Sequence, residues 1–327
     1  AAAGLMFASN FLSSLIQPLL GMMTDRRSMP WLMAAGMLIS GLGITLIGFL
    51  NSYWAIFALV MFSGLGSAMF HPEAGRMSNC VAGEKKGRGM SIFTVGGNIG
   101  FVIGPGITTV AVSVWGLKGA AVILLPVLTI VSIFICQNKN FAQFSTAMTE
   151  VRRIEIESDD KKDDWKGFGK LSVSIFARSI ITAGVQVFIP LYWVSVLMQT
   201  KELGSLMVTV MAVAAVFATL AGGHMADRFG FKKTILTSFS LLLPLLVLLL
   251  MTGNVIFATI ILVPMSASMH LGYSPSVALG QKYLPNRLGL ASGITLGLAI
   301  SVGGISTPLL GVIGDRYGLT TVMYVIA

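Results

Sequence analysis

The sequence predicts an all-α membrane protein with many spanning helices. Of its 327 residues, 55% are hydrophobic and only 11% are charged, whereas soluble domains carry roughly 25% charged residues. Apolar runs of about 20 residues, the length that crosses a bilayer as a helix, recur along the whole chain. With only 2 Cys, the same composition excludes a soluble globule, a disulfide-stapled secreted domain and a disordered chain.

Ten complete spans are expected, and an eleventh apolar run begins near residue 319. In chain order the ten fall at 1–23, 31–50, 53–82, 89–112, 119–136, 171–199, 204–226, 233–252, 254–281 and 288–312. Each run is long enough to satisfy its own backbone hydrogen bonds as a helix inside hydrocarbon.

Basic residues orient these spans. Of the 22 Lys and Arg, 18 lie in alternate connections or at the span ends that border them. They are Arg26, Arg27, Arg76, Lys85, Lys86, Arg88, seven between Lys139 and Lys170, Arg228, Lys232, Lys233, Lys282 and Arg287. The positive-inside rule places these connections in the cytoplasm, so the net charge of +9 does not indicate a nucleic-acid partner. Tyr53, Trp54, Trp115, Tyr192 and Trp193 are expected to form an interfacial belt at the outer edge.

The two halves of the chain repeat at an offset of 202–203 residues. Gly21 and Asp25 correspond to Gly223 and Asp227, Pro72 to Pro275, and Pro105 to Pro308. The 171–199 span then has no counterpart unless another span precedes residue 1, and the last span should continue beyond Ala327. We therefore expect a parent protein of two pseudo-symmetric six-helix halves, of which this chain lacks the first helix and most of the last.

Three regions follow from this repeat. Residues 1–136 form the N-terminal helical bundle and residues 171–327 the C-terminal bundle. Residues 137–170, with seven basic and seven acidic side chains, form a charged cytoplasmic linker. The linker is expected either to form a short surface helix or to stay disordered.

Two loop motifs resemble the signature of the major facilitator superfamily. They are Gly21-Met-Met-Thr-Asp25-Arg26-Arg27 and Gly223-His-Met-Ala-Asp227-Arg228-Phe-Gly230, the first with Ser28 where Gly is common. A second block, Phe70-His71-Pro72-Glu73-Ala74 with Arg88-Gly89 and Val95-Gly96-Gly97-Asn98-Ile-Gly100, is similar to the fosmidomycin-resistance branch. The resemblance implies a multi-pass transporter of the plasma membrane, the inner membrane in a bacterium. It implies proton-driven export of drug-like molecules by alternating access, with no bound cofactor, no metal and no enzymatic activity.

Glu73 is the only acidic residue deep within any span. A lone carboxylate in hydrocarbon is costly and usually faces a partner or a watery cavity. We expect Glu73 to carry the coupling proton, with His71 in the same layer. The alternative is that Glu73 only pairs with Arg76 at i, i+3.

The resemblance also implies which helices line the central cavity, and their polar and aromatic residues are the expected substrate contacts. These are Arg178, Gln186, Phe70, His270, Tyr273, Ser274 and Asn98, with Thr182 and Phe188 beside them. Arg178 is a permanent cation within a span, which favours small anionic or zwitterionic substrates. Two alternatives stay open: Arg178 only pairs with Glu73, and Asn98 makes an interhelical hydrogen bond instead of a cavity contact.

A conformational switch is expected at the signature loops. Its candidate residues are Gly21, Asp25, Arg26, Gly223, Asp227, Arg228, Arg76 and Arg88. Because a carboxylate is stabilised at the positive end of a helix, Asp25 should approach the start of the 288–312 span and Asp227 the start of the 89–112 span. Gly96, Gly97, Gly100 and Gly104 are expected to allow close helix packing, and Pro105 a bend.

Other functions are weighed against export. A proton-coupled importer of a small metabolite remains the main alternative. An intramembrane metalloenzyme built on His71, His270 and Glu73 is remote, because their spacing matches no ligand motif. A channel is disfavoured, because repeats with charges near the midplane suit alternating access. The expected partners are the lipid bilayer and a small-molecule substrate, and the protein is expected to be a monomer.

Overall fold

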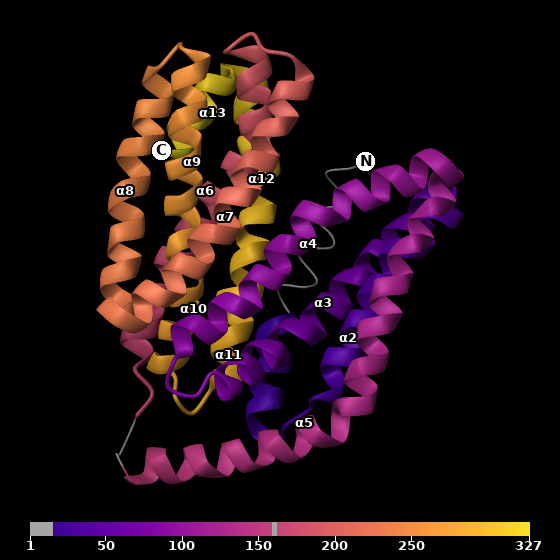
Figure 1. Ribbon diagram of the computed structural model, residues 1–327, viewed down its shortest axis with the longest axis vertical. Coiled ribbons are helices and arrows are strands. Elements are labelled where there is room, and N and C mark those ends of the chain that lie inside the picture. The colour runs from indigo at the N-terminus through magenta and orange to yellow at the C-terminus, as the bar shows by residue number, and fades with distance from the viewer. Residues whose placement is uncertain (1–15, 159–161) are drawn as a thin grey trace. The chain divides into compact units, whose positions relative to one another are not determined.

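The computed structural model describes residues 16–158 and 162–327. All regular structure in these residues is helical, with no strand, and eight helical stretches are long and apolar enough to cross a membrane. The all-α membrane fold is therefore confirmed (Figure 1). Two of the ten expected spans, 89–112 and 119–136, fall within one continuous stretch, Lys86–Val151, and most of the span at 1–23 lies outside the described residues.

The described residues group into two compact units. The first unit takes its described residues from 16–81, 103–158, 162–172 and 280–301. It contains α2 (Trp31–Thr45), η1 (Leu46–Phe49), α3 (Tyr53–Val81), the end of α4 (Lys86–Trp115), η2 (Gly116–Ile123), α5 (Leu124–Ser158), α11 (Leu288–Ser292) and the π-helix η3 (Gly293–Leu298). The start of α6 (Trp165–Ser195), the end of α10 (Tyr273–Tyr283) and the first residues of α12 (Ala299–Tyr317) also belong to it. Within this unit α2 packs against both α3 and α5.

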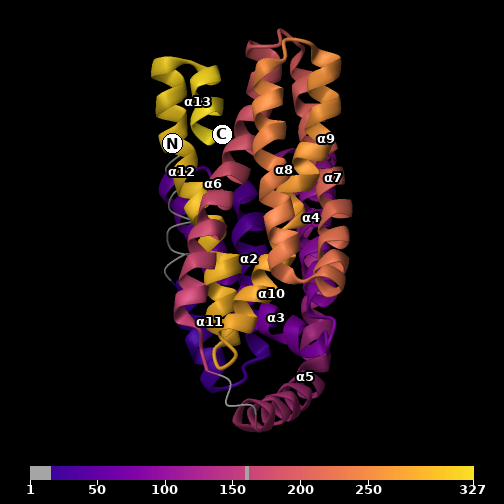
Figure 2. The same cartoon turned by 90° about the vertical axis from the view of Figure 1, so that its left-hand side faces the viewer.

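The second unit takes its residues from 82–102, 173–279 and 302–327. It contains the start of α4, most of α6 (Trp165–Ser195), α7 (Lys201–Phe229), α8 (Phe231–Met251), α9 (Val255–Leu271), the start of α10 (Tyr273–Tyr283), most of α12 (Ala299–Tyr317) and α13 (Leu319–Ile326). α8 and α9 lie side by side in both views (Figures 1 and 2). Its core joins α6, α7, α8, α9 and α13 through buried side chains such as Trp193, Met207, Leu246, Met265 and Met323.

Each unit contains segments from both expected bundles. The start of α4 groups with the C-terminal helices, whereas residues 280–301 group with the N-terminal helices. The contacts therefore do not divide at the expected boundaries of 136 and 171, and the two six-helix halves stay a prediction.

The expected linker at 137–170 begins inside a helix. α5 continues to Ser158, and α6 already begins at Trp165. Of the two expected forms, a helix is therefore what the structure has for residues 137–158, and it continues the preceding span.

Two aromatic residues of the expected interfacial belt are buried instead of exposed. Tyr53, Trp54 and Trp115 are exposed, but Tyr192 and Trp193 are 2% and 0% exposed. Both belong to the core of the second unit, because the end of α6 packs against neighbouring helices instead of facing the bilayer interface.

Candidate functional site

The first signature loop ends in a carboxylate that caps another helix. Asp25 accepts hydrogen bonds from the backbone N–H groups of Gly289, at 2.6 Å, and Leu290, at 2.9 Å. A Cβ on Gly21 would overlap the carbonyl of Gly289, so glycine one turn before Asp25 lets the two backbones approach. The expected contact of Asp25 with the start of the 288–312 span is confirmed.

The second signature loop repeats this geometry in the second unit. Asp227 accepts from the N–H groups of Gly87 and Arg88, each at 2.8 Å. A Cβ on Gly223 would collide with the carbonyl of Gly87 and with the Ser91 side chain. The expected contact of Asp227 with the start of α4 is also confirmed. Each carboxylate accepts from N–H groups at a helix N-terminus, which have no acceptor within their own helix. The helix N-terminus also carries partial positive charge.

The arginines of the proposed switch take a smaller part in these contacts. Arg26 is exposed, and the Arg228 guanidinium lies over the Phe229 ring, 5.2 Å from its centroid. Arg88 contributes its backbone N–H to Asp227. The glycine and aspartate of each loop therefore make the close contacts with the helix starts.

Glu73 is fully buried and paired with Arg76. The Arg76 guanidinium donates from Nε to Oε2 at 2.8 Å and from Nη2 to Oε1 at 2.6 Å. Arg76 Nη2 also donates to Ser28 Oγ at 3.0 Å and to Ser145 Oγ at 2.6 Å. This bidentate pair is the i, i+3 alternative left open by the sequence, and it lies wholly within the first unit.

Asn79 and Gln281 form a buried amide pair that was not among the predicted site residues. Asn79 Nδ2 donates to Gln281 Oε1 at 2.7 Å, and Gln281 Nε2 donates to the Gly75 carbonyl at 3.0 Å and to Ser292 Oγ at 2.8 Å. The two residues are 202 positions apart, the offset of the sequence repeat. The repeat places the two residues at similar positions of its two halves, but it does not specify that they touch.

Arg178 is a buried cation of the second unit. It is 5% exposed, and its Nη1 donates to the Met269 carbonyl at 3.3 Å. Its guanidinium lies over the Tyr273 ring, 4.5 Å from the centroid. Among the described residues it makes no ion pair, and its Nε has no hydrogen-bond partner.

Further polar atoms without partners lie on the same two segments as Arg178 and Tyr273. Ser274 is 0% exposed, and neither its Oγ nor the Thr182 Oγ1 has a hydrogen-bond partner among the described residues. His270 is buried, and its Nδ1 lies 2.9 Å from the Ser266 carbonyl. Since buried polar groups are nearly always hydrogen-bonded, Ser274, Thr182 and Arg178 Nε are unusual in lacking a partner among the described residues.

The other predicted contacts are divided. Gln186 is exposed, whereas Phe188 is buried in the core of the second unit and does not line a cavity as expected. His71 Nδ1 lies 2.9 Å from the Ser67 carbonyl, and its ring packs edge-on against Phe70. Asn98 donates to Thr219 Oγ1 on α7 at 3.1 Å, which is the interhelical alternative.

The predicted packing glycines of α4 do not make close contacts. A Cβ on Gly96, Gly97, Gly100 or Gly104 would meet no described atom within 4 Å. Helices approach closely at other glycines, such as Gly21 and Gly223, where the backbone of another helix lies against the glycine. α4 also continues through Pro105 without a break. In the described parts of the chain, no group of three His, Cys, Asp or Glu residues could hold a metal ion.

Comparison with known proteins gives consistent matches. The family model described as Major Facilitator Superfamily matches residues 1–308. The chain is 32% identical to the MFS-type transporter YfnC of Bacillus subtilis (strain 168), over 98% of this chain and 79% of that protein. It is 27% identical to the fosmidomycin resistance protein of Escherichia coli (strain K12), over 96% of this chain and 78% of that protein.

Solved structures show the same fold at low sequence identity. The outward conformation of FucP matches with a TM-score of 0.74 and 15% identity, covering 99% of this chain and 89% of that one. The human organic anion transporter MFSD10 (TETRAN) matches with a TM-score of 0.78 and 14% identity, covering 99% and 80%.

Proposed function

Because the chain belongs to the Major Facilitator Superfamily, we propose that it is a proton-coupled exporter of small anionic or zwitterionic organic compounds. The family assignment makes it a multi-pass membrane transporter and not an enzyme. The proposal adds the direction, the coupling ion and the substrate class. We place it in a bacterial inner membrane, as a monomer with residues 137–170 in the cytoplasm.

Arg178 carries the substrate assignment. A guanidinium within a membrane span is costly and needs an opposite charge or several acceptors. Arg178 has one carbonyl and one aromatic face. A carboxylate, phosphonate or phosphate would supply the missing charge and could bond the guanidinium through two parallel N–H groups.

The surrounding groups favour a small compound with further polar atoms. The Ser274 hydroxyl is buried without a partner, and Tyr273 presents its ring to Arg178. A substrate hydroxyl or amide would satisfy Ser274, while its apolar part would lie against the aromatic ring.

Glu73 is the proposed proton carrier. It is fully buried, and its two oxygens are held by one arginine. Protonation would cancel its charge and weaken the hold on Arg76, so a proton arriving at Glu73 changes the contacts of Arg76 with Ser28 and Ser145. Export as the direction is supported by the similarity to the fosmidomycin resistance protein, whose name describes resistance to a compound.

Transport in vesicles with an imposed pH gradient tests the proposal. We expect gradient-driven export of organic phosphonates or carboxylates, and Arg178→Gln should abolish it. Arg316→Gln is the matched control, since Arg316 is an exposed cation on α12. Movement of the same compounds only in the opposite direction would favour the importer. Competition by lipophilic cations that Arg178→Gln leaves unchanged would contradict the anion assignment.

A further inference from the structure

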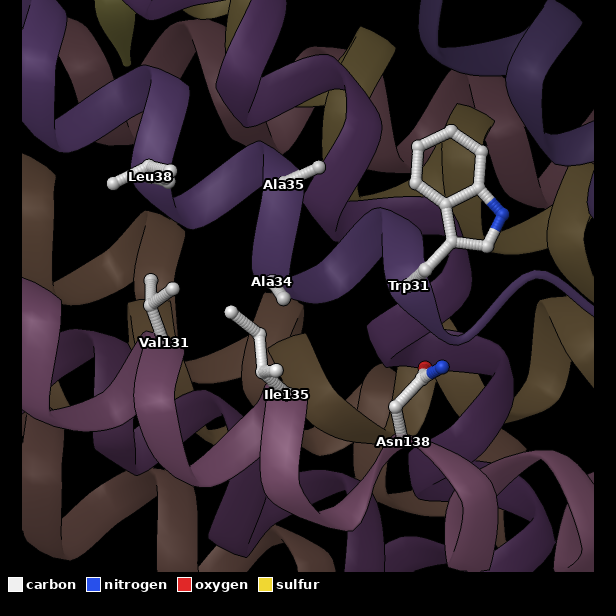
Figure 3. Close-up of a pocket in the computed structure, with 7 residues that line it drawn as sticks. All are labelled: Trp31, Ala34, Ala35, Leu38, Val131, Ile135 and Asn138. Carbon is white, nitrogen blue, oxygen red and sulfur yellow. The ribbon is translucent and has the colours of Figure 1, made fainter.

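A groove lies between two membrane helices of the first unit, and none of the residues that line it belongs to the contacts described above. Trp31, Ala34, Ala35 and Leu38 on α2 form one wall, and Val131, Ile135 and Asn138 on α5 form the other. The two rows face each other (Figure 3). The groove has a volume of about 310 Å³, at the lower end of the ~300–1,000 Å³ that ligand pockets occupy.

The groove results from the way the two helices diverge. Near Gly41 the helices touch, because a Cβ there would lie 2.6 Å from Val127 Cγ1. Towards Trp31 the alanines at 34 and 35 leave space that a larger side chain would fill. The wall from Trp31 to Leu38 is about 10 Å long at roughly 1.5 Å per residue.

The other end of the groove is also fixed. Ser28, which precedes α2, donates a hydrogen bond to Ser145 of α5 at 2.6 Å, and Arg76 bonds both hydroxyls. Contacts at the two ends of the groove, near Gly41 and at Ser28, thus hold α2 and α5 apart between them. The groove is therefore part of the packed structure.

The chemistry of the walls changes along the groove. The end at Leu38 and Val131 is wholly apolar, whereas the end at Trp31 carries the amide of Asn138. Three exposed cations adjoin this polar end in the sequence: Arg26 and Arg27 before α2, and Lys139 next to Asn138. Tryptophan at a span end is typical of the bilayer interface, and basic residues there attract anionic headgroups.

We propose that this groove binds an anionic phospholipid, with one acyl chain along Ala34, Ala35 and Leu38 and the headgroup phosphate at Lys139 and Asn138. α2 and α5 both belong to membrane-crossing stretches, so the surrounding medium supplies acyl chains. The apolar end at Leu38 matches the acyl chain of such a lipid, and the cationic end at Lys139 matches its headgroup. This proposal is independent of the transported compound.

Native mass spectrometry of the purified protein with added phosphatidylglycerol or phosphatidylcholine tests the lipid assignment. We expect phosphatidylglycerol to bind more tightly, and Lys139→Gln to weaken its binding about fivefold, the usual contribution of one cation near an anionic surface. Phosphatidylcholine binding should not change in this variant. Lys118→Gln, at an exposed lysine of η2, is the control and should leave both lipids unaffected.

Filling the groove tests the acyl-chain position. Ala35→Phe should abolish binding of both lipids, and the smaller Ala35→Leu should weaken it. Ala147→Phe, at an exposed position of α5 outside the groove, should have no effect. Undiminished phosphatidylglycerol binding by a folded Ala35→Phe or Ala35→Leu protein would overturn the groove as the site. Equal binding of the two lipids, unchanged by Lys139→Gln, would overturn the headgroup assignment.

Discussion

Glu73 and Arg76 show how two charges can be accommodated where neither is hydrated. Each is nearly or fully buried, and the bidentate geometry is the strongest that an arginine and a carboxylate can form. Removing one partner from such a pair leaves the other charge buried and uncompensated. The stability of this region and the proposed proton transfer therefore depend on the same two side chains.

Single and double substitutions separate these two roles. Glu73→Gln should lower the free energy of unfolding by about 3–5 kcal/mol, because Arg76 keeps its charge without a counterion. The double variant Glu73→Gln/Arg76→Gln removes both charges and should recover most of that stability. Thermal unfolding in detergent measures this effect.

If Glu73 carries the proton, transport driven by the pH gradient should be absent in both the single and the double variant. Gradient-driven efflux in the stable double variant would contradict the coupling role of Glu73 and leave the pair a purely structural feature. Transport assays with the pH gradient on and off distinguish these outcomes.

At the scale of helices, glycine matters where a partner backbone lies against it. Gly21 and Gly223 face the start of another helix, whereas a Cβ on Gly96 or Gly97 would meet no described atom within 4 Å. Replacing glycine by a larger residue should therefore destabilise the protein at the first two positions but not at the other two.

Matched alanine substitutions test this difference. Gly223→Ala should push α7 away from the start of α4 and weaken the two hydrogen bonds to Asp227, each worth about 1.5–3 kcal/mol when one partner is charged. Gly97→Ala should be neutral or stabilise α4 by up to about 1 kcal/mol, because alanine is the better helix former. Thermal unfolding of the two variants is the measurement, and equal destabilisation by both would contradict the assignment.

Ser145 connects the long helix α5 to the first signature loop. It is 0% exposed and contacts both Arg76 and Ser28. Ser145→Ala should free the end of α5, so residues 140–158 should exchange their amide hydrogens faster. Thr146→Ala is the control, because Thr146 is exposed and bonds only its own helix. Unchanged exchange in Ser145→Ala would show that these hydrogen bonds do not hold the helix.

At the scale of the whole molecule, the sequence predicts the features that depend on its apolar runs and on its internal repeat. Apolar runs located the spans, and the repeat predicted that Asp25 and Asp227 would meet the starts of two distant helices. Features that depend on tertiary neighbours were missed: the burial of Trp193 in a core, the open surroundings of Gly97 and the pairing of Asn79 with Gln281. A residue's own type and spacing do not specify which helix will pack beside it.

The orientation in the membrane is a property of the whole chain, and it rests on the unequal distribution of lysine and arginine. The rule predicts that Lys166, at the start of α6, faces the cytoplasm and that Lys118, on η2, faces the opposite side. Both side chains are exposed. Substituting each by cysteine, in a protein without its own two cysteines, therefore places a thiol on each predicted side.

A membrane-impermeant maleimide then reports the orientation. We expect Lys166→Cys to react in inside-out vesicles only and Lys118→Cys in right-side-out vesicles only. The reverse pattern would contradict the assigned orientation, and it would also place the exposed cations Arg26, Arg27 and Lys139 on the outer side. Reaction of both thiols from the same side would require an even number of crossings between η2 and α6, in conflict with the single long helix α5 that joins them.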